Sequence, residues 1–315
     1  MIYLALLLLS AGLAAALTPL VRTLGRHWGL FDAPGERKIH TMSVPRVGGV
    51  GVTLAAVLAL AIVTALGWAS VADVAGWLPA LLGVVIVFGV GLRDDLKPVR
   101  PVVKLVFQTL AALVAVAMGV SINHITFSGT TYQLGVLTGP VTIIWIVGLT
   151  NAFNLMDGLD GLATGLAIIA AATCAAVSIM RDDTQGGLLL VALLGALCGF
   201  LPYNFNPATI FLGDSGSLVV GHVLAVTAIN GWQKGATALA VAVPLLIFAL
   251  PISETVISVV RRTRGAGLRA VFSADQQHIH YRLIALGLSH RSAVLLLYVV
   301  SLALALLALA TMQMR

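Results

Sequence analysis

Residues 139–180 read GPVTIIWIVGLTNAFNLMDGLDGLATGLAIIAAATCAAVSIM, which is two long apolar runs on either side of a short polar connection. An apolar run of roughly 20 residues is long enough to cross the ~30 Å hydrocarbon core of a bilayer as a helix. Neither run has the alternation of polar and apolar residues that is typical of a membrane β-barrel strand. This stretch therefore predicts two membrane-spanning α-helices joined at the membrane edge.

The same pattern recurs along the whole chain. Of its 315 residues, 59% are hydrophobic and 10% are charged, and the mean hydropathy is +1.04, which is typical of an integral membrane protein. We predict an all-α, polytopic membrane protein with about ten spans, forming a single domain over residues 1–315. The expected spans are 2–21, 47–67, 78–92, 104–121, 139–153, 162–180, 187–201, 217–231, 237–257 and 292–311.

Two segments should depart from straight membrane helices. Ile122–Thr138 has β-forming residues around Ser128-Gly129, and we expect a small external hairpin there. The ninth span contains Pro244 and Pro251, which should bend it. The bend is either a harmless kink or part of a groove for a lipid chain.

The basic residues indicate the orientation. Of the 18 Lys and Arg residues, 15 lie in or beside the loops 22–46, 93–103, 154–161, 202–216 and 258–291. The other three are Arg181, Lys234 and Arg315. Since short cytoplasmic loops carry an excess of Lys and Arg, this distribution predicts that the basic side is cytoplasmic and that both termini are outside.

Five aspartates lie beside the apolar runs, and all five fall on the basic side. They are Asp94, Asp95, Asp157, Asp160 and Asp214. A charge near the bilayer centre costs roughly 2.5–3.5 kcal/mol on insertion scales. We therefore expect these carboxylates to lie together at the cytoplasmic interface, where a cation or a phosphate can use them.

Each acidic stretch allows a functional and a structural interpretation. Adjacent side chains at a helix end point in different directions, so one of Asp94 and Asp95 can face a reaction centre while the other orients a neighbour. Alternatively, both belong to a solvated helix end with Arg93 and Lys97. Asp214 precedes two serines, which suits anion binding at a helix start, or else an N-terminal cap.

The stretch Thr150–Gly161 has polar residues at intervals of three. If it is helical, Asn151, Asn154, Asp157 and Asp160 lie along one face. A plain connector between two spans would not need four aligned Asn and Asp side chains. We therefore predict a functional polar stripe at this point.

Two basic stretches provide candidate partners for phosphate. His278, His280 and Arg282 lie in the long basic loop, and their composition suits contact with phosphate or sugar hydroxyls. A zinc site has little support because the spacing is unusual and no cysteine is nearby. Lys38 precedes the glycine-rich start of the second span, where phosphate binding competes with a simple positive-inside anchor. The alternative for the loop that carries the two histidines is a plain surface segment.

Together these features predict phosphoryl-type transfer at a membrane edge. Mg²⁺ usually takes one or two protein ligands and shares its remaining positions with substrate phosphates and water. Most of the five aspartates should therefore have other roles. The combination indicates transfer between a soluble phosphate donor and a lipid in the inner leaflet.

Motifs along nearly the whole chain resemble those of the polyprenyl-phosphate N-acetylhexosamine-1-phosphate transferases. The matching stretches are Arg37-Lys38 with Pro45–Gly49, Asp94-Asp95, Asn151–Gly161, Gly213–Gly216 and His278–His280. The resemblance implies ten membrane helices with outside termini, Mg²⁺ dependence with Mn²⁺ as a substitute, and frequent homodimers. It also implies a bacterial inner-membrane location and a role in the first membrane step of a cell-envelope glycan.

The resemblance further implies a role for each site residue. Asp214 and Asn154 would hold Mg²⁺, and Asp94, assisted by Asp95, would act on the lipid phosphate. Asp157 and Asp160 would position the nucleotide. The remaining residues would contact substrate, and they are Lys38, Lys104, Asn151, His278, His280 and Arg282.

The implied reaction joins N-acetylhexosamine-1-phosphate from a UDP-sugar to polyprenyl phosphate and releases UMP, with no nucleic acid as partner. The pattern His278-Ile-His280 resembles the N-acetylglucosamine branch, whereas the muramoyl-pentapeptide branch has three consecutive histidines. Tyr281 departs from the further histidine that is frequent in the first branch, so another UDP-sugar stays open. A secondary transporter is the alternative from a different class, because ionisable residues in membranes also mark ion paths.

Overall fold

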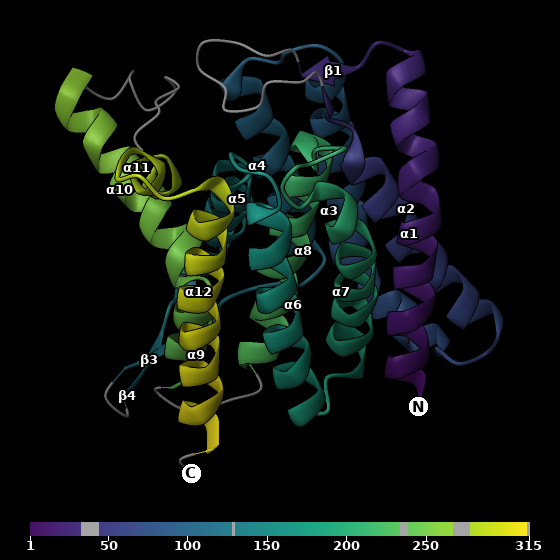
Figure 1. Cartoon of the computed structure of the whole chain (residues 1–315). Helices are drawn as coiled ribbons and strands as arrows, with labels where there is room; N and C mark the ends of the chain where they lie inside the picture. The colour runs from purple at the N-terminus through teal and green to yellow at the C-terminus, as the bar shows by residue number, and fades with distance from the viewer. Residues whose placement is uncertain (33–43, 128–129, 234–238, 267–277, 314–315) are drawn as a thin grey trace.

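The computed structural model describes residues 1–32, 44–127, 130–233, 239–266 and 278–313, and it is mostly helical. The helices alternate in direction along the chain and form one bundle (Figure 1). The first part contains α1 (Ile2–His27), α2 (Gly48–Ala65), α3 (Val71–Leu96), α4 (Pro101–Ala117) and α5 (Thr138–Met156). The second part contains α6 (Leu162–Met180), α7 (Thr184–Asn204), α8 (Gly213–Gln233), α9 (Leu239–Ile247), α10 (Ala249–Ala266), α11 (Ile279–Ala285) and α12 (His290–Gln313).

Two short antiparallel ribbons complete the fold. Strand β1 (Phe31–Asp32) pairs with β2 (Val44–Pro45) between α1 and α2. Strand β3 (His124–Phe127) pairs with β4 (Thr130–Gln133), and a 3₁₀ turn, η1 (Gly135–Leu137), leads into α5. The hairpin predicted within 122–138 is confirmed, because β-forming residues on both sides of Ser128-Gly129 pair in register.

The protein is a multi-pass membrane protein. Among the described residues, seven helices are long and apolar enough to span a membrane, and α4 and α8 contain shorter apolar segments. Every expected span overlaps a helix, and the segment 162–180 matches α6 residue for residue. The total of ten spans stays a prediction, as do the side on which the termini lie and the single-domain assignment.

The ninth expected span is divided. Helix α9 ends at Ile247 and α10 begins at Ala249, so the break falls between Pro244 and Pro251. A proline ring cannot donate a backbone hydrogen bond and crowds the preceding turn, which explains the interruption. The predicted bend is therefore confirmed. In Figure 1, α10 leans outward from the bundle.

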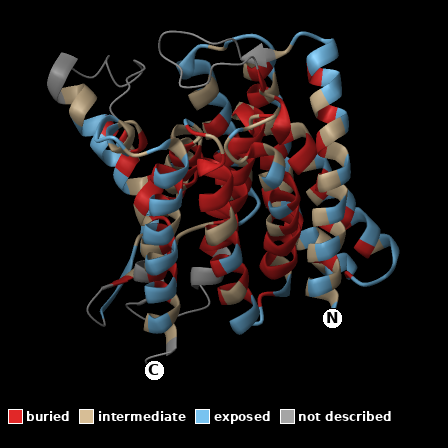
Figure 2. Cartoon of the chain, viewed as in Figure 1, coloured by how far each residue is buried: buried red, intermediate tan, exposed pale blue. Residues whose placement is uncertain are grey.

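Helix α8 is the centre of the bundle. It packs against α2, α3, α5 and α6, and nearly every residue from Gly213 to Ile229 is buried (Figure 2). A helix that is apolar on all sides is stable only when other helices surround it. By contrast, α1, α3, α4 and α12 carry many exposed Leu and Val side chains, as expected for helices that face lipid.

Both termini and the β3–β4 hairpin lie at one end of the bundle, and β1 and α11 lie at the other (Figure 1). Helix α3 runs toward the β1 end, so Asp94 and Asp95 are in its last turn, and Asp214 is in the first turn of α8 at that same end. The alternation of helices thus gathers the carboxylates as the sequence predicts.

The orientation can be tested with cysteine labels at opposite ends of the bundle. Asp182 is an exposed residue of the α6–α7 turn, and Lys97 is exposed between α3 and α4. In a chain that lacks both native cysteines, Asp182→Cys should react in intact cells with a membrane-impermeant maleimide. Lys97→Cys should react only after permeabilisation. The reverse pattern would overturn the predicted orientation.

Candidate functional site

A polar cavity of about 250 Å³ lies at the β1 end of the bundle. Four of the five predicted aspartates line it, and they are Asp95, Asp157, Asp160 and Asp214. They come from three separate parts of the chain, namely the end of α3, the turn after α5 and the start of α8. The cavity is therefore a product of tertiary structure, and it has the acidic character that the sequence predicts.

The fifth aspartate joins this group through a lysine. The Lys104 ammonium, on α4, lies 2.6 Å from Oδ2 of Asp214 and 3.2 Å from Oδ2 of Asp94. The other oxygen of Asp94 accepts a hydrogen bond from the Val99 amide. Lys104 thus connects α3 to α8 beside the cavity that Asp214 lines.

Asp95 has a different environment from its neighbour. Its side chain is 5% exposed, and it accepts hydrogen bonds from the amides of Asp214 and Ser215 at 2.8 and 3.0 Å. These amides belong to the first turn of α8, and the N–H groups of a first turn have no acceptor within their own helix. A carboxylate is also favoured at this end by the helix dipole. Asp95 therefore fixes the start of α8, which is an orienting role.

Arg46 gives the end of α3 a matching cap. Its guanidinium donates to the backbone carbonyls of Asp94 and Asp95 at 2.8 and 3.2 Å, and it also lines the cavity. A cation is favoured at a helix C-terminus, where the last carbonyls lack partners. Arg46 lies in the basic, glycine-rich stretch noted in the sequence, but nothing in the sequence indicated its contact with α3.

The turn after α5 differs from the predicted helical stripe. Helix α5 ends at Met156, and Asp157 already has a non-helical backbone. Gly161 has a φ of +79°, in the left-handed region that glycine adopts without strain. The expectation that Asp157 and Asp160 continue one helical face with Asn154 was wrong, because the backbone leaves the helix before both.

Each acid of this turn holds the loop that precedes α8. The Gly213 amide donates to Asp157 at 3.1 Å. Asp160 accepts hydrogen bonds from the Asn206 side chain at 2.9 Å and from the Ala208 amide at 3.0 Å. Both acids are only partly buried and still line the cavity, so each combines an ordering contact with access to a bound molecule.

The two asparagines of α5 do not line the cavity. Asn154 donates to the Ser217 hydroxyl at 3.0 Å, so its side chain is directed at the first turn of α8. Asn151 forms a reciprocal amide pair with Gln108 of α4. Gln108 is buried, and the sequence gave no sign of this partner. The contact with Gln108 fastens α4 to α5, and Asn151 does not line the cavity.

The histidine motif is buried behind Tyr281, which lines the cavity. His278 Nδ1 lies 2.7 Å from Oε1 of Glu254 on α10, and the Ile279 amide donates to Oε2 at 3.1 Å. The rings of His278 and His280 are stacked with centroids 5.5 Å apart, and Tyr281 lies 4.4 Å from His280. Glu254 was not predicted as a site residue, since it is distant in sequence from the motif that it holds.

His280 lies directly against the turn after α5. A Cβ at Gly158 would lie 2.5 Å from its Nε2, so any larger residue there would displace the imidazole. Burial, together with the nearby charge of His278, lowers the pKa of His280 to about 4, and the ring is neutral at pH 7. Tyr281 lines the cavity, whereas Arg282 is exposed on α11. Lys38 lies outside the described residues.

The acids and amides around the cavity are suited to the predicted magnesium ion. Among the described residues, no group of three or more His, Cys, Asp and Glu side chains is arranged to enclose a metal ion. Mg²⁺ does not require such a group, because it commonly uses one or two carboxylates and completes its octahedron with phosphate oxygens and water. Asp214, with Asn154 and Asp157 near it, fits this pattern.

The excess of acids over cations in the cavity also favours a bound cation. Burial raises the pKa of Asp157, and the nearby carboxylates of Asp214 and Asp95 raise it further. Two cations, Lys104 and Arg46, lie beside the four acids that line the cavity. A cavity with surplus carboxylates at a membrane edge is suited to a cation and a phosphorylated ligand.

Membrane helices that bring acids and a lysine together at one end form the kind of site used by membrane-embedded phosphotransferases. The chain belongs to glycosyl transferase family 4, whose model matches residues 77–232. That range contains all five aspartates but not the histidine motif. The family assignment identifies an enzyme, and it replaces the transporter alternative.

Relatives extend the match over most of the chain. A probable undecaprenyl-phosphate N-acetylglucosaminyl 1-phosphate transferase of Bacillus subtilis (strain 168) is 34% identical, covering 90% of this chain and 78% of the relative. A decaprenyl-phosphate N-acetylglucosaminephosphotransferase of Mycobacterium tuberculosis (strain CDC 1551 / Oshkosh) is 36% identical, covering 91% and 78%. A phospho-N-acetylmuramoyl-pentapeptide-transferase of Limosilactobacillus reuteri (strain DSM 20016) is 38% identical, covering 59% and 60%.

The different environments of the adjacent aspartates predict different effects of one substitution. Asp95→Asn should lower the stability by about 1–3 kcal/mol, because its amide offers one acceptor oxygen to two α8 amides and leaves a buried donor without a partner. Asp94→Asn should change the melting temperature less but lower turnover more, because Asp94 is partly exposed and pairs with Lys104. Thermal unfolding in detergent and turnover would be measured for both. A melting temperature of Asp95→Asn equal to that of the parent would contradict the capping role.

The raised pKa of Asp157 predicts a pH dependence of stability. Between the ordinary and the raised value, the native state keeps a proton that the unfolded chain has lost, so stability should fall as pH rises through this range. Asp157→Asn keeps an acceptor for the Gly213 amide and has no charge. In chelator it should melt above the parent at neutral pH, and the difference should shrink toward pH ~5. A difference in melting temperature between Asp157→Asn and the parent that is the same at every pH would refute the prediction.

Proposed function

We propose that the protein transfers N-acetylglucosamine-1-phosphate from UDP-N-acetylglucosamine to a polyprenyl phosphate and releases UMP. The observation that carries the proposal is the bridge from Asp94 through Lys104 to Asp214, the last of which lines the acidic cavity. It places a cation between two acids at the end of apolar helices, where a lipid phosphate and a soluble diphosphate can meet. The relatives named as N-acetylglucosamine transferases cover about nine-tenths of the chain, which favours that donor.

In the proposed reaction, an oxygen of the lipid phosphate attacks the phosphorus that bears the sugar. The bond between this phosphorus and the oxygen that bridges it to the uridine-linked phosphate breaks, and UMP leaves. The second pKa of a phosphate monoester is near ~6, so most of the lipid phosphate is already deprotonated at neutral pH. Asp94 therefore does not need to accept a proton, and its fixed position suits an orienting role.

The residues of the cavity divide the remaining work. Asp214 and Asn154 would hold Mg²⁺, which neutralises charge on the diphosphate. Lys104 would offset phosphate charge, and Asp157 and Asp160 would position the nucleotide. His278, held by Glu254, and the neutral His280 would contact the diphosphate or the sugar. Arg282 and Lys38 are proposed to contribute further positive charge.

The acceptor chain has a suitable groove beside the broken helix. An apolar groove of about 290 Å³ lies between α5 and the α9–α10 break, and its lining includes Trp145, Gly148, Leu245 and Ile252. Two of the next residues on α10, Thr255 and Val256, also line it, directly after Glu254. We propose that the polyprenyl chain lies here, that the site faces the cytoplasm of a bacterial inner membrane, and that the enzyme forms a homodimer.

The reaction can be tested with purified protein, radiolabelled UDP-N-acetylglucosamine, undecaprenyl phosphate and Mg²⁺. We expect labelled lipid and UMP in equal amounts, and no turnover in chelator. UDP-N-acetylmuramoyl-pentapeptide and other UDP-sugars would be supplied in parallel. A clear preference for one of them would replace the donor assignment, and turnover that is unchanged in chelator would remove the metal from the proposal.

Asp214→Asn should lower Mg²⁺-dependent turnover by about 100-fold or more, because it removes a charged ligand at nearly constant volume. Asp182→Asn is the matched control. It makes the same change at the opposite end of the bundle, at a φ of +54° that asparagine tolerates, and should leave turnover unchanged. Equal turnover and Mg²⁺ dependence of Asp214→Asn and the parent would exclude Asp214 as a ligand.

A further inference from the structure

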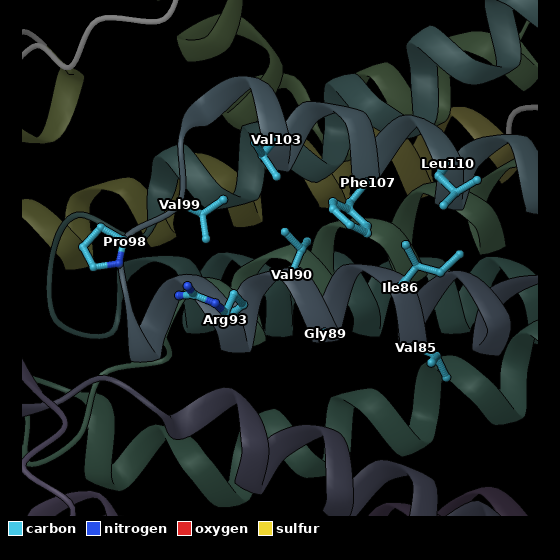
Figure 3. Close-up of a pocket in the computed structure, with 10 residues that line it drawn as sticks. All are labelled: Val85, Ile86, Gly89, Val90, Arg93, Pro98, Val99, Val103, Phe107 and Leu110. Carbon is cyan, nitrogen blue, oxygen red and sulfur yellow. The ribbon is translucent and has the colours of Figure 1, made fainter.

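A second apolar groove lies on the lipid-facing surface between α3 and α4 (Figure 3). Its volume is about 630 Å³. Val85 and Gly89 line it on α3, and Val103 and Phe107 line it on α4. All four are exposed at the protein surface, so the groove is open to the hydrocarbon of the bilayer along its length.

One end of this groove is positively charged. Arg93 is the single charged residue among the described residues that line it, and in Figure 3 it lies at the end near Pro98 and Val99. Its guanidinium donates to the Lys97 carbonyl at 2.8 Å, and no acid in the described ranges forms an ion pair with it. Lys97 and Arg100 are exposed on the same connection. The groove thus offers an apolar channel that ends at a cluster of cations.

The groove and the acidic cavity use different faces of α4. Lys104 and Gln108 point inward, where Lys104 meets Asp94 and Gln108 meets Asn151. Val103 and Phe107 are one position earlier on the helix and turn toward the groove. A lipid head group at Arg93 would therefore lie outside the cavity and would not be presented to Lys104 and Asp214.

We propose that this groove binds an anionic phospholipid of the surrounding bilayer, with an acyl chain between α3 and α4 and its phosphate on Arg93. Guanidinium binds phosphate through paired, charge-assisted hydrogen bonds. Basic residues next to membrane helices also attract anionic lipids by their charge. A zwitterionic lipid gains less from the three cations, since its own ammonium opposes them.

A second copy of the chain fits this groove less well. A helix with side chains is about 10–12 Å wide and would rest on the edges of the groove. Such a contact would also bury Arg93 without a carboxylate partner, and an unpaired buried charge is strongly destabilising. A lipid fills the channel and brings its own negative charge.

Glycine positions allow a direct test. A Cβ at Gly89 would meet no heavy atom within 4 Å, so Gly89→Leu should fill the groove without moving either helix. Gly12, on α1, is also exposed and has equally open surroundings, so Gly12→Leu is the matched control. Arg93→Gln removes the charge, and Arg93→Lys retains it. Since each change is on the surface, folding can be verified by thermal unfolding.

Binding of phosphatidylglycerol and of phosphatidylcholine would be measured by native mass spectrometry of the purified protein. The parent and Gly12→Leu should retain phosphatidylglycerol in preference to phosphatidylcholine. Gly89→Leu and Arg93→Gln should each weaken phosphatidylglycerol binding about 10-fold, and Arg93→Lys should weaken it less. Parent-like binding by either Gly89→Leu or Arg93→Gln would overturn the proposal, as would equal retention of the two lipids by the parent.

A second experiment separates this lipid from the acceptor. Gly148 lines the other groove and also has no heavy atom within 4 Å of a Cβ. Gly148→Leu should raise KM for undecaprenyl phosphate and leave phosphatidylglycerol binding unchanged. Gly89→Leu should weaken phosphatidylglycerol binding and leave KM for undecaprenyl phosphate unchanged. If Gly89→Leu raised KM for undecaprenyl phosphate, or if that lipid displaced phosphatidylglycerol from the parent, the α3–α4 groove would be the acceptor's and the inference would fail. Because lipid binding is measured without turnover, its result stands apart from the proposed reaction.

Discussion

The contact between the Asp95 carboxylate and the first amides of α8 is the constraint on which the site depends. It joins the end of α3 to the start of the most buried helix, and both carboxylate oxygens take part. Close packing makes this contact available. A Cβ at Gly91 would lie 2.6 Å from the Asp214 carbonyl oxygen, and one at Gly49 would lie 2.1 Å from the Gly216 nitrogen. Glycine is needed at both positions, because any side chain would separate the helix ends that carry the acids.

Around this junction, opposing charges hold helix ends that would otherwise be unsatisfied. Arg46 satisfies carbonyls at the end of α3, Asp95 satisfies amides at the start of α8, and Lys104 links the two through Asp94 and Asp214. The result is an ordered group of acids with less positive charge than negative charge. Buried acids without enough cations cost free energy when the cavity is empty. A bound cation that carries a diphosphate would offset this cost.

The membrane-facing surface has two separate apolar grooves. One lies between α5 and the α9–α10 break, and two of its lining residues, Thr255 and Val256, directly follow Glu254 on α10. The other lies on the outer side of the α3–α4 hairpin and ends at Arg93. The two grooves have no lining residue in common, and Lys104 and Gln108 of α4 face inward, away from the groove that Val103 and Phe107 line.

The sequence alone determined the helices and the end of the bundle at which the acids gather. Long apolar runs can cross a membrane only as helices, and their alternation indicates which connections share an end. The β-forming residues of 122–138 predicted the hairpin, and Pro244 and Pro251 predicted a bend in the ninth span. What each acid contacts was decided by tertiary structure. Asp94 and Asp95 are neighbours in sequence, yet one meets Lys104 and the other meets amides about 120 residues away. The contacts of Asn151 with Gln108 and of Glu254 with His278 also join residues that are far apart in sequence, so tertiary structure decided them too. A hydrogen bond depends on position within a few tenths of an ångström, and only the packing of α3, α4, α5, α8 and α10 against one another sets positions that closely.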